Sequence, residues 1–166
     1  MTLIPIIALL AAAPLQQGQV VPDFTAKTSA GQTVKLSELV KEKTVVLAFF
    51  PRAFTPGCTM QMKAFRDRFA ELEKKGATVF GVSMDDAETL ARFKKDLNAP
   101  FEFLADPDGR ITTLLGMRDE GDKTADRGNF VIGEDRKVLA FEAGMRAIDP
   151  DDAIAACPLR KSDNKK

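Results

Sequence analysis

The sequence has no histidine, and it has only two cysteines, Cys58 and Cys157, among its 166 residues. The absence of histidine excludes the hydrolases in which a histidine activates a serine or a cysteine. The two cysteines stand far apart in the chain, which is not the spacing of a structural zinc site. The feature that remains for chemistry is a lone thiol.

An excess of charge of either sign is also lacking. The 24 basic and 24 acidic residues cancel, and no long block of one sign occurs. This balance argues against a nucleic-acid interface and favours a substrate that is small or uncharged. With 45% hydrophobic and 29% charged residues, the composition predicts one compact domain with a real core.

The two ends of the chain differ from the rest. Residues 1–17 contain no charged side chain and include the apolar run LIPIIALLAAA, which is too short to span a membrane. We expect a signal peptide here and an exported, periplasmic or extracytoplasmic protein. The alternative is a short hydrophobic N-terminal arm that packs on the domain or on a partner, in a protein that stays in the cytoplasm. Residues 160–166 read as a solvated tail, which leaves residues 18–159 as the domain.

The centre of the sequence alternates between strand and helix patterns. The apolar run at 44–50 predicts a strand that is buried on both faces. Apolar side chains then recur at spacings of three and four, which predicts one helix that ends at Gly76. These side chains are Met62, Phe65, Phe69 and Leu72. Because 77–83 predicts a second buried strand, residues 44–83 should form a βαβ unit with parallel strands.

The second half continues this order. A helix with Leu90, Phe93 and Leu97 on one face should follow, and then a strand, a turn and a short helix. Residues 129–143 predict a hairpin, and the segment DPDDAIAAC predicts a closing helix. A parallel βαβ unit followed by a hairpin and a helix predicts a thioredoxin-like α/β fold, in which helices flank a central mixed sheet.

The surroundings of Cys58 predict a reactive thiol. Thr55 suits the N-cap of the helix, and Pro56 suits its first position, where the missing N–H costs nothing. Cys58 then lies in the first turn, where free backbone N–H groups and the helix dipole favour the nucleophilic thiolate. Gly57 keeps the approach open. The alternative is a buried structural cysteine, which would not need the Thr-Pro-Gly turn.

The same residues resemble a known family. Pro51, Thr55 and Cys58 match the Pro-x-x-x-Thr-x-x-Cys signature of the peroxiredoxins. Residues 55–61 also match the Thr-Pro-Gly-Cys-Thr-x-Gln string of the Q type, or bacterioferritin comigratory proteins. The resemblance extends over roughly residues 18–145. It implies a thiol peroxidase that reduces hydrogen peroxide or organic hydroperoxides and needs no cofactor.

The resemblance also implies roles for individual residues. Cys58 would attack a peroxide oxygen and become a sulfenic acid. Thr55 would hydrogen-bond the thiolate and the peroxide, and Pro51 would exclude water. Arg127 corresponds to the family arginine, which would stabilise negative charge while the oxygen–oxygen bond breaks. Gln61 could orient this arginine, or it could be a solvated helical residue.

Two departures from the family pattern affect these expectations. Asn129 stands where the family usually has threonine, and Lys63 stands where many Q-type members have the resolving cysteine. The sulfenic acid must then be recycled by Cys157, within one chain or across a homodimer, or by an external thiol donor such as thioredoxin. Alternatively, Cys157 is only a small apolar residue on a helix face. The sequence does not distinguish a monomer from a homodimer.

A function of another class fits the same fold. A thioredoxin-like domain can also exchange disulfides or bind thiols without peroxidase activity. Exchangers generally use Cys-x-x-Cys, and Gln61 occupies the place of the second cysteine after Cys58.

Overall fold

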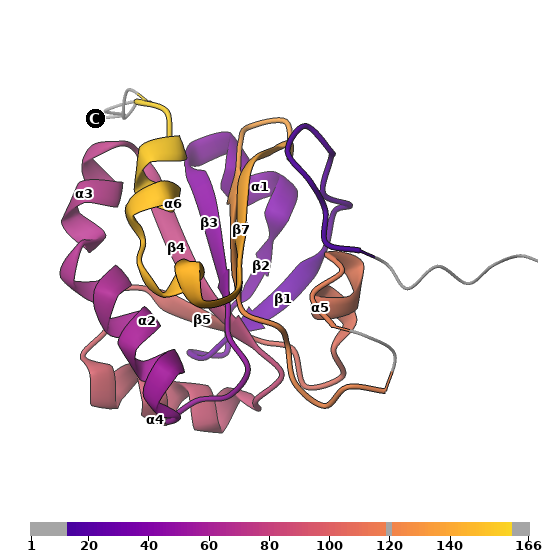
Figure 1. The fold of residues 1–166 in the computed structure, drawn as a ribbon, viewed down its shortest axis with the longest axis vertical. Helices are drawn as coiled ribbons and strands as arrows, with labels where there is room; N and C mark the ends of the chain where they lie inside the picture. Colours follow the sequence, from indigo (N-terminus) through magenta and orange to yellow (C-terminus); the bar gives the residue numbers. More distant parts are fainter. Residues whose placement is uncertain (1–12, 119–120, 161–166) are drawn as a thin grey trace, which may run out of the picture.

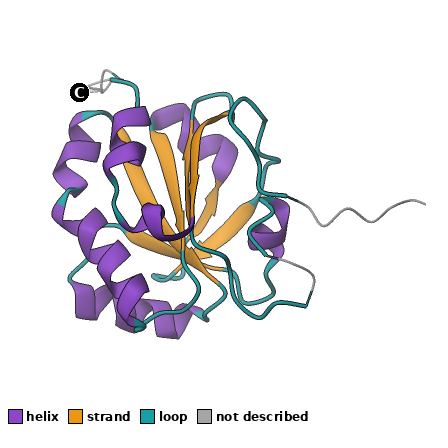
Figure 2. Cartoon of the chain, in the orientation of Figure 1, coloured by secondary structure: helices purple, strands orange, loops and turns teal. Residues whose placement is uncertain are grey.

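A computed structural model describes residues 13–118 and 121–160 of the chain, and its centre is a seven-stranded mixed sheet (Figures 1 and 2). The strands are β1 (Thr25–Thr28), β2 (Thr33–Lys35), β3 (Thr44–Phe49), β4 (Ala77–Ser83), β5 (Glu102–Ala105), β6 (Gly128–Ile132) and β7 (Val138–Ala143). The α-helices are α1 (Leu36–Glu42), α2 (Pro56–Asp67), α3 (Phe69–Lys74), α4 (Ala87–Leu97), α5 (Arg110–Leu114) and α6 (Asp151–Ala156). A 3-10 helix, η1 (Gly144–Ile148), joins β7 to α6.

The order of the strands is β2-β1-β5-β4-β3-β6-β7. The three central strands β3, β4 and β5 are parallel, and β6 pairs with β3 in the antiparallel direction. Every residue of β3 is buried, as its unbroken apolar sequence predicts. The predicted βαβ unit, the hairpin and the closing helix are all confirmed, and together they give the thioredoxin-like fold.

Two apolar cores cover the two faces of the sheet. Successive side chains of β3 alternate between them, so that Val46 and Ala48 face one core while Val45 and Leu47 face the other. The first core contains the apolar faces of α2, α3, α4 and α6. The second contains those of α1 and α5. Figure 2 shows the sheet between these two groups of helices.

The prediction of a single helix between β3 and β4 is wrong in one respect. The chain leaves helical geometry at Arg68, where φ is −110° and ψ is 12°, and this residue separates α2 from α3. Apolar side chains on both sides of the break still face the sheet, among them Phe65 and Leu72. The hydrophobic spacing therefore could not reveal the break. The β1–β2 hairpin, α1 and η1 were not predicted.

Near both ends of the described part, residues make hydrogen bonds to the domain. The expected leader falls mostly on residues 1–12, outside the described part, whereas the N–H of Leu15 donates to the carbonyl of Leu115 at 3.1 Å. At the other end, the guanidinium of Arg160 donates to the carbonyls of Val40 and Lys41 in the last turn of α1. Arg160 therefore belongs to the fold rather than to a solvated tail. Among the described residues, no helix is long and apolar enough to cross a membrane.

Candidate active site

Cys58 lies in the first turn of α2, just beyond the carboxyl end of β3. Thr55 has the extended backbone of an N-cap residue and Pro56 opens the helix, as the sequence predicts. The hydroxyl of Thr55 does not cap the helix, however, because it donates to the carbonyl of Arg52 at 2.9 Å. The side chain of Cys58 is only 1% exposed. The thiol is therefore placed among the free N–H groups of a helix start and is shielded from bulk water.

The loop that begins at Pro51 and leads into α2 is held by Asp85, which lies just after the neighbouring strand β4. Phe54 has a φ of 65°, in the left-handed region, which is unusual for a bulky side chain. The carboxylate of Asp85 accepts hydrogen bonds from the N–H of Ala53 and the hydroxyl of Ser83, both at 2.8 Å. Sequence reasoning missed this role, because Asp85 and the loop are far apart in the chain.

Arg127 reaches the thiol from the strand on the other side of β3. It directly precedes β6, whose first residue, Gly128, pairs with Phe49 at the end of β3. The guanidinium Nη2 donates to the Sγ of Cys58 at 3.6 Å, and Nη1 donates to the Oε1 of Gln61 at 2.7 Å. A fixed positive charge thus faces the sulfur, while one side-chain amide holds the guanidinium in place.

Gln61 is fully buried, so it is not a solvated helical residue. Its Nε2 donates to the carbonyl of Phe49 at 3.3 Å and to the Oδ1 of Asn129 at 3.1 Å. These two bonds point its Oε1 toward Arg127. The signal for this role in the sequence was the position of Gln61 one helical turn beyond Cys58, on the same face of α2.

Comparison with known proteins agrees with this geometry. A model described as the AhpC/TSA family matches residues 17–141. The chain belongs to this family. The chloroplastic peroxiredoxin Q of Triticum aestivum is 43% identical over 103 residues, which are 62% of this chain and 47% of the wheat protein. The putative peroxiredoxin bcp of Coxiella burnetii is 34% identical over 132 residues, which are 76% of this chain and 87% of the bacterial protein.

A solved structure extends the comparison to the fold. The crystal structure of peroxidoxin BcpB from Mycobacterium tuberculosis superposes with a TM-score of 0.81 at 32% sequence identity. The match covers 86% of this chain and 96% of that one. This AhpC/TSA chain therefore aligns with bacterial relatives over most of their length, whereas it spans about half the length of the wheat relative.

The second cysteine of this AhpC/TSA chain lies at the other end of the sheet. Lys75 Nζ donates to the carbonyl of Cys157 at 3.2 Å, and Lys75 stands just before the start of β4. Cys58 lies instead beyond the carboxyl end of β3, and a strand of that length extends about 17–20 Å. Figure 1 shows α2 beginning and α6 ending at opposite ends of the molecule. Both thiols are free, and the structure does not bring them together.

The environment of Cys157 differs from that of Cys58. Its side chain is 2% exposed, and its Sγ donates to the carbonyl of Ala153 at 3.2 Å. Burial raises the pKa of the Cys157 thiol to about 11, and the nearby Lys75 offsets this only in part. Because the thiolate is the nucleophile, Cys157 is a poor attacking group at neutral pH.

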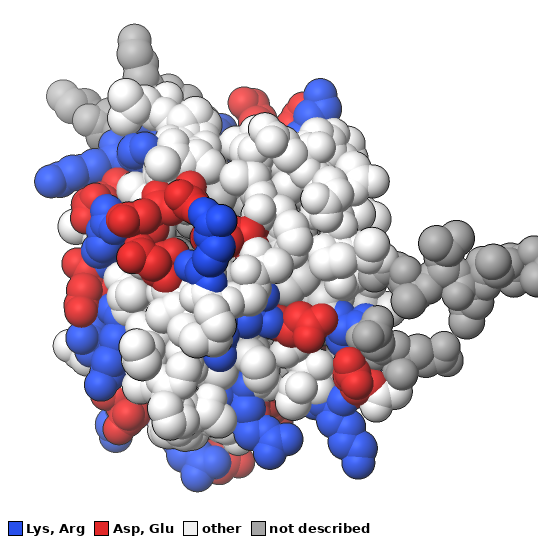
Figure 3. Space-filling view, viewed as in Figure 1, with Lys and Arg blue, Asp and Glu red and all other residues white. Residues whose placement is uncertain are grey.

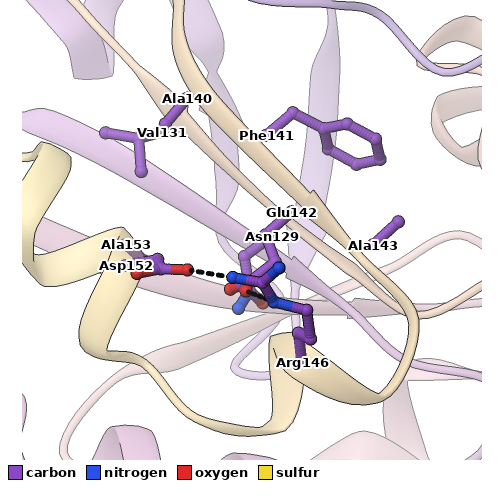
Figure 4. A pocket seen from close by; sticks show the side chains of 9 residues that line it. All are labelled: Asn129, Val131, Ala140, Phe141, Glu142, Ala143, Arg146, Asp152 and Ala153. Atoms are coloured by element: carbon purple, nitrogen blue, oxygen red, sulfur yellow. Dashed lines mark hydrogen bonds and ion pairs between the residues drawn. The ribbon is translucent and has the colours of Figure 1, made fainter.

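Asn129 also lines a cavity of about 470 Å³, together with residues of β7, η1 and α6 (Figure 4). Arg146 joins Glu142 and Asp152 by ion pairs of 3.3 and 3.4 Å, and Figure 3 shows acidic and basic side chains gathered on this surface. Burial, with Asp152 nearby, raises the pKa of Glu142. None of the residues that line this cavity is a cysteine. Among the described residues, no three Cys, Asp or Glu side chains converge as a metal site would require.

The close approach of Arg127 to α2 predicts the effect of Gly57→Ala. A Cβ at this position would lie 3.0 Å from Nη2 of Arg127, the nitrogen that faces Cys58, so the guanidinium must shift from its present position. We expect iodoacetamide to alkylate Cys58 roughly tenfold more slowly, while stability changes by no more than about 1 kcal/mol. Lys63→Ala, at an exposed position of the same helix, is the control. An unchanged rate in Gly57→Ala would show that the contact does not govern reactivity.

The raised pKa of Cys157 predicts a loss of stability at alkaline pH. An unfolded thiol loses its proton near pH 9, whereas the folded thiol keeps it until about pH 11. Between these values the unfolded state binds fewer protons, so the free energy of unfolding falls as pH rises. We expect this fall to be about 2–3 kcal/mol larger in the wild type than in Cys157→Ala, measured by urea denaturation from pH 8 to pH 11. If the free energy of unfolding fell equally with pH in both proteins, the raised pKa of Cys157 would be contradicted.

Proposed function

We propose that this chain is a thiol peroxidase of the peroxiredoxin Q type that reduces hydrogen peroxide or organic hydroperoxides at Cys58. The observation that carries the proposal is the guanidinium of Arg127 on the sulfur of Cys58 in the first turn of α2. Membership of the AhpC/TSA family and the likeness to BcpB support it.

The reaction needs only groups that the site contains. The Cys58 thiolate attacks one peroxide oxygen, the oxygen–oxygen bond breaks, and the other oxygen takes a proton and leaves as water or an alcohol. The sulfur is oxidised to a sulfenic acid, and the peroxide is reduced by two electrons. Arg127 stabilises the negative charge on the departing oxygen. Because Thr55 already donates its hydroxyl proton to Arg52, its oxygen is best used as an acceptor for the hydroperoxide O–H.

An external thiol recycles the sulfenic acid in this proposal. Cys157 is buried beyond the far end of β3, and a disulfide requires Cα atoms within about 7 Å. A thioredoxin-like protein or a small thiol would displace water from the sulfenic acid to form a mixed disulfide, and a second thiol would release Cys58. The disulfide-exchange alternative is weaker, because the buried amide of Gln61 occupies the place of a second cysteine.

Stopped-flow oxidation by hydrogen peroxide tests the proposal. We expect Cys58 to react far faster than a free cysteine, Cys58→Ser to be inactive, and Arg127→Ala to be slower by about 100-fold or more. Cys157→Ala should keep both the rate of oxidation and multiple turnover with an external thiol. A wild-type rate no faster than that of free cysteine would overturn the peroxidase assignment. A Cys58–Cys157 disulfide after peroxide treatment, with turnover lost in Cys157→Ala, would overturn recycling from outside.

The protein is further proposed to act outside the cytoplasm. The charge-free apolar run near the N-terminus motivates this proposal. We expect N-terminal sequencing of the protein from its native host to give a start after Ala13. An intact Met1 or Thr2 on cytosolic protein would instead favour an N-terminal arm.

A further inference from the structure

We infer that Asn129 is a positioning residue of the thiol site, which orients the amide of Gln61 and, through it, the guanidinium of Arg127. The inference rests on the proposed function and assigns a role to a residue at which this chain departs from the usual threonine. Asn129 lies in β6 between Ala48 of β3 and Glu142 of β7, and it is 1% exposed.

The hydrogen bonds of Asn129 have a fixed direction. Its Nδ2 donates to the carbonyl of Ala147 at 2.9 Å, so its Oδ1 must face Gln61 and accept from Nε2. Gln61 then presents Oε1 to Arg127, whose other nitrogen faces Cys58. If the amide of Gln61 turned over, an NH₂ group would face the guanidinium and an oxygen would face Oδ1 of Asn129, which would leave buried donors and acceptors unpaired.

The 3-10 helix η1 supports this arrangement at two points. Ala147, in the last turn of η1, accepts the hydrogen bond that orients Asn129. Gly144, its first residue, donates its N–H to the backbone carbonyl of Arg127 at 2.8 Å. The same short segment therefore fixes the main chain of Arg127 directly and its side chain through two amides.

The length of asparagine suits this role. A threonine hydroxyl is attached to Cβ and lies closer to the strand than a carboxamide does, so it would not bridge Gln61 and Ala147 in the same geometry. Asn129 also forms part of the wall of the cavity beside Glu142 and Arg146 (Figure 4). It thus belongs both to the hydrogen-bond network of the thiol site and to the wall of a cavity that charged side chains line.

A double-mutant cycle tests whether Asn129 acts through Arg127. We expect Asn129→Val to slow the oxidation of Cys58 by hydrogen peroxide by about tenfold to 100-fold, because the guanidinium loses its fixed position. In an Arg127→Ala background, the same substitution should change the rate by less than about twofold. A purely structural role would lower the rate by the same factor in both backgrounds, and that result would overturn the inference.

The control is Val131→Ala, which removes packing from the same strand and the same face without touching the amides. It should lower the urea midpoint but leave the rate within about twofold of the wild type. If Asn129→Val does not fold, Asn129→Thr takes its place in the cycle, with the same direction expected. A folded Asn129 variant with the wild-type rate would also overturn the inference.

A second measurement separates this inference from the proposed peroxidase activity. Iodoacetamide alkylation of Cys58 needs no peroxide, and we expect Asn129→Val to slow it only when Arg127 is present. If the wild type does not react rapidly with peroxide but the alkylation rates show this dependence, the proposed function fails and the positioning role stands. If the wild type is a fast peroxidase and the dependence is missing from both rates, the positioning role fails alone.

Discussion

The contact between the guanidinium of Arg127 and the sulfur of Cys58 is the constraint on which the site depends. The two residues are far apart in the chain, and they meet because β6 runs antiparallel to β3 in the adjacent position of the sheet. The chain leaves β3 at its carboxyl end and then begins α2. At this same end of β3, Arg127 directly precedes the first residue of β6. The first turn of α2 and the side chain of Arg127 consequently meet at Cys58.

Holding a charged group in this place requires polar groups inside an apolar core. Gln61 and Asn129 are both buried, and a buried amide without partners would cost about 1–3 kcal/mol. Each amide instead has a donor and an acceptor partner, so the network is satisfied from Cys58 to η1. The carboxylate of Asp85, just after β4, fixes the loop before α2 through the N–H of Ala53.

The two thiols show how position in one fold separates chemical roles. Cys58 faces a guanidinium at the carboxyl end of β3, whereas Cys157 faces a backbone carbonyl near the start of β4 and has its pKa raised by burial. The sheet that positions the site around Cys58 also keeps the second cysteine away from it. In the proposed function, oxidation of Cys58 and its recycling are therefore separate steps, and the second uses a thiol from outside.

The sequence by itself determined the features that depend on neighbouring residues. Apolar runs and spacings of three and four gave the central βαβ unit, and Thr55 and Pro56 marked the start of the helix that carries Cys58. Family resemblance, rather than periodicity, pointed to Arg127. Only the tertiary structure decided the break at Arg68, the attachment of Arg160 to α1 and the separation of the two cysteines. It also decided the contacts of Asn129 with Gln61 and Ala147. The contacts of Arg160 and Asn129 and the distance between the cysteines depend on residues that are far apart along the chain, and no local pattern can specify them.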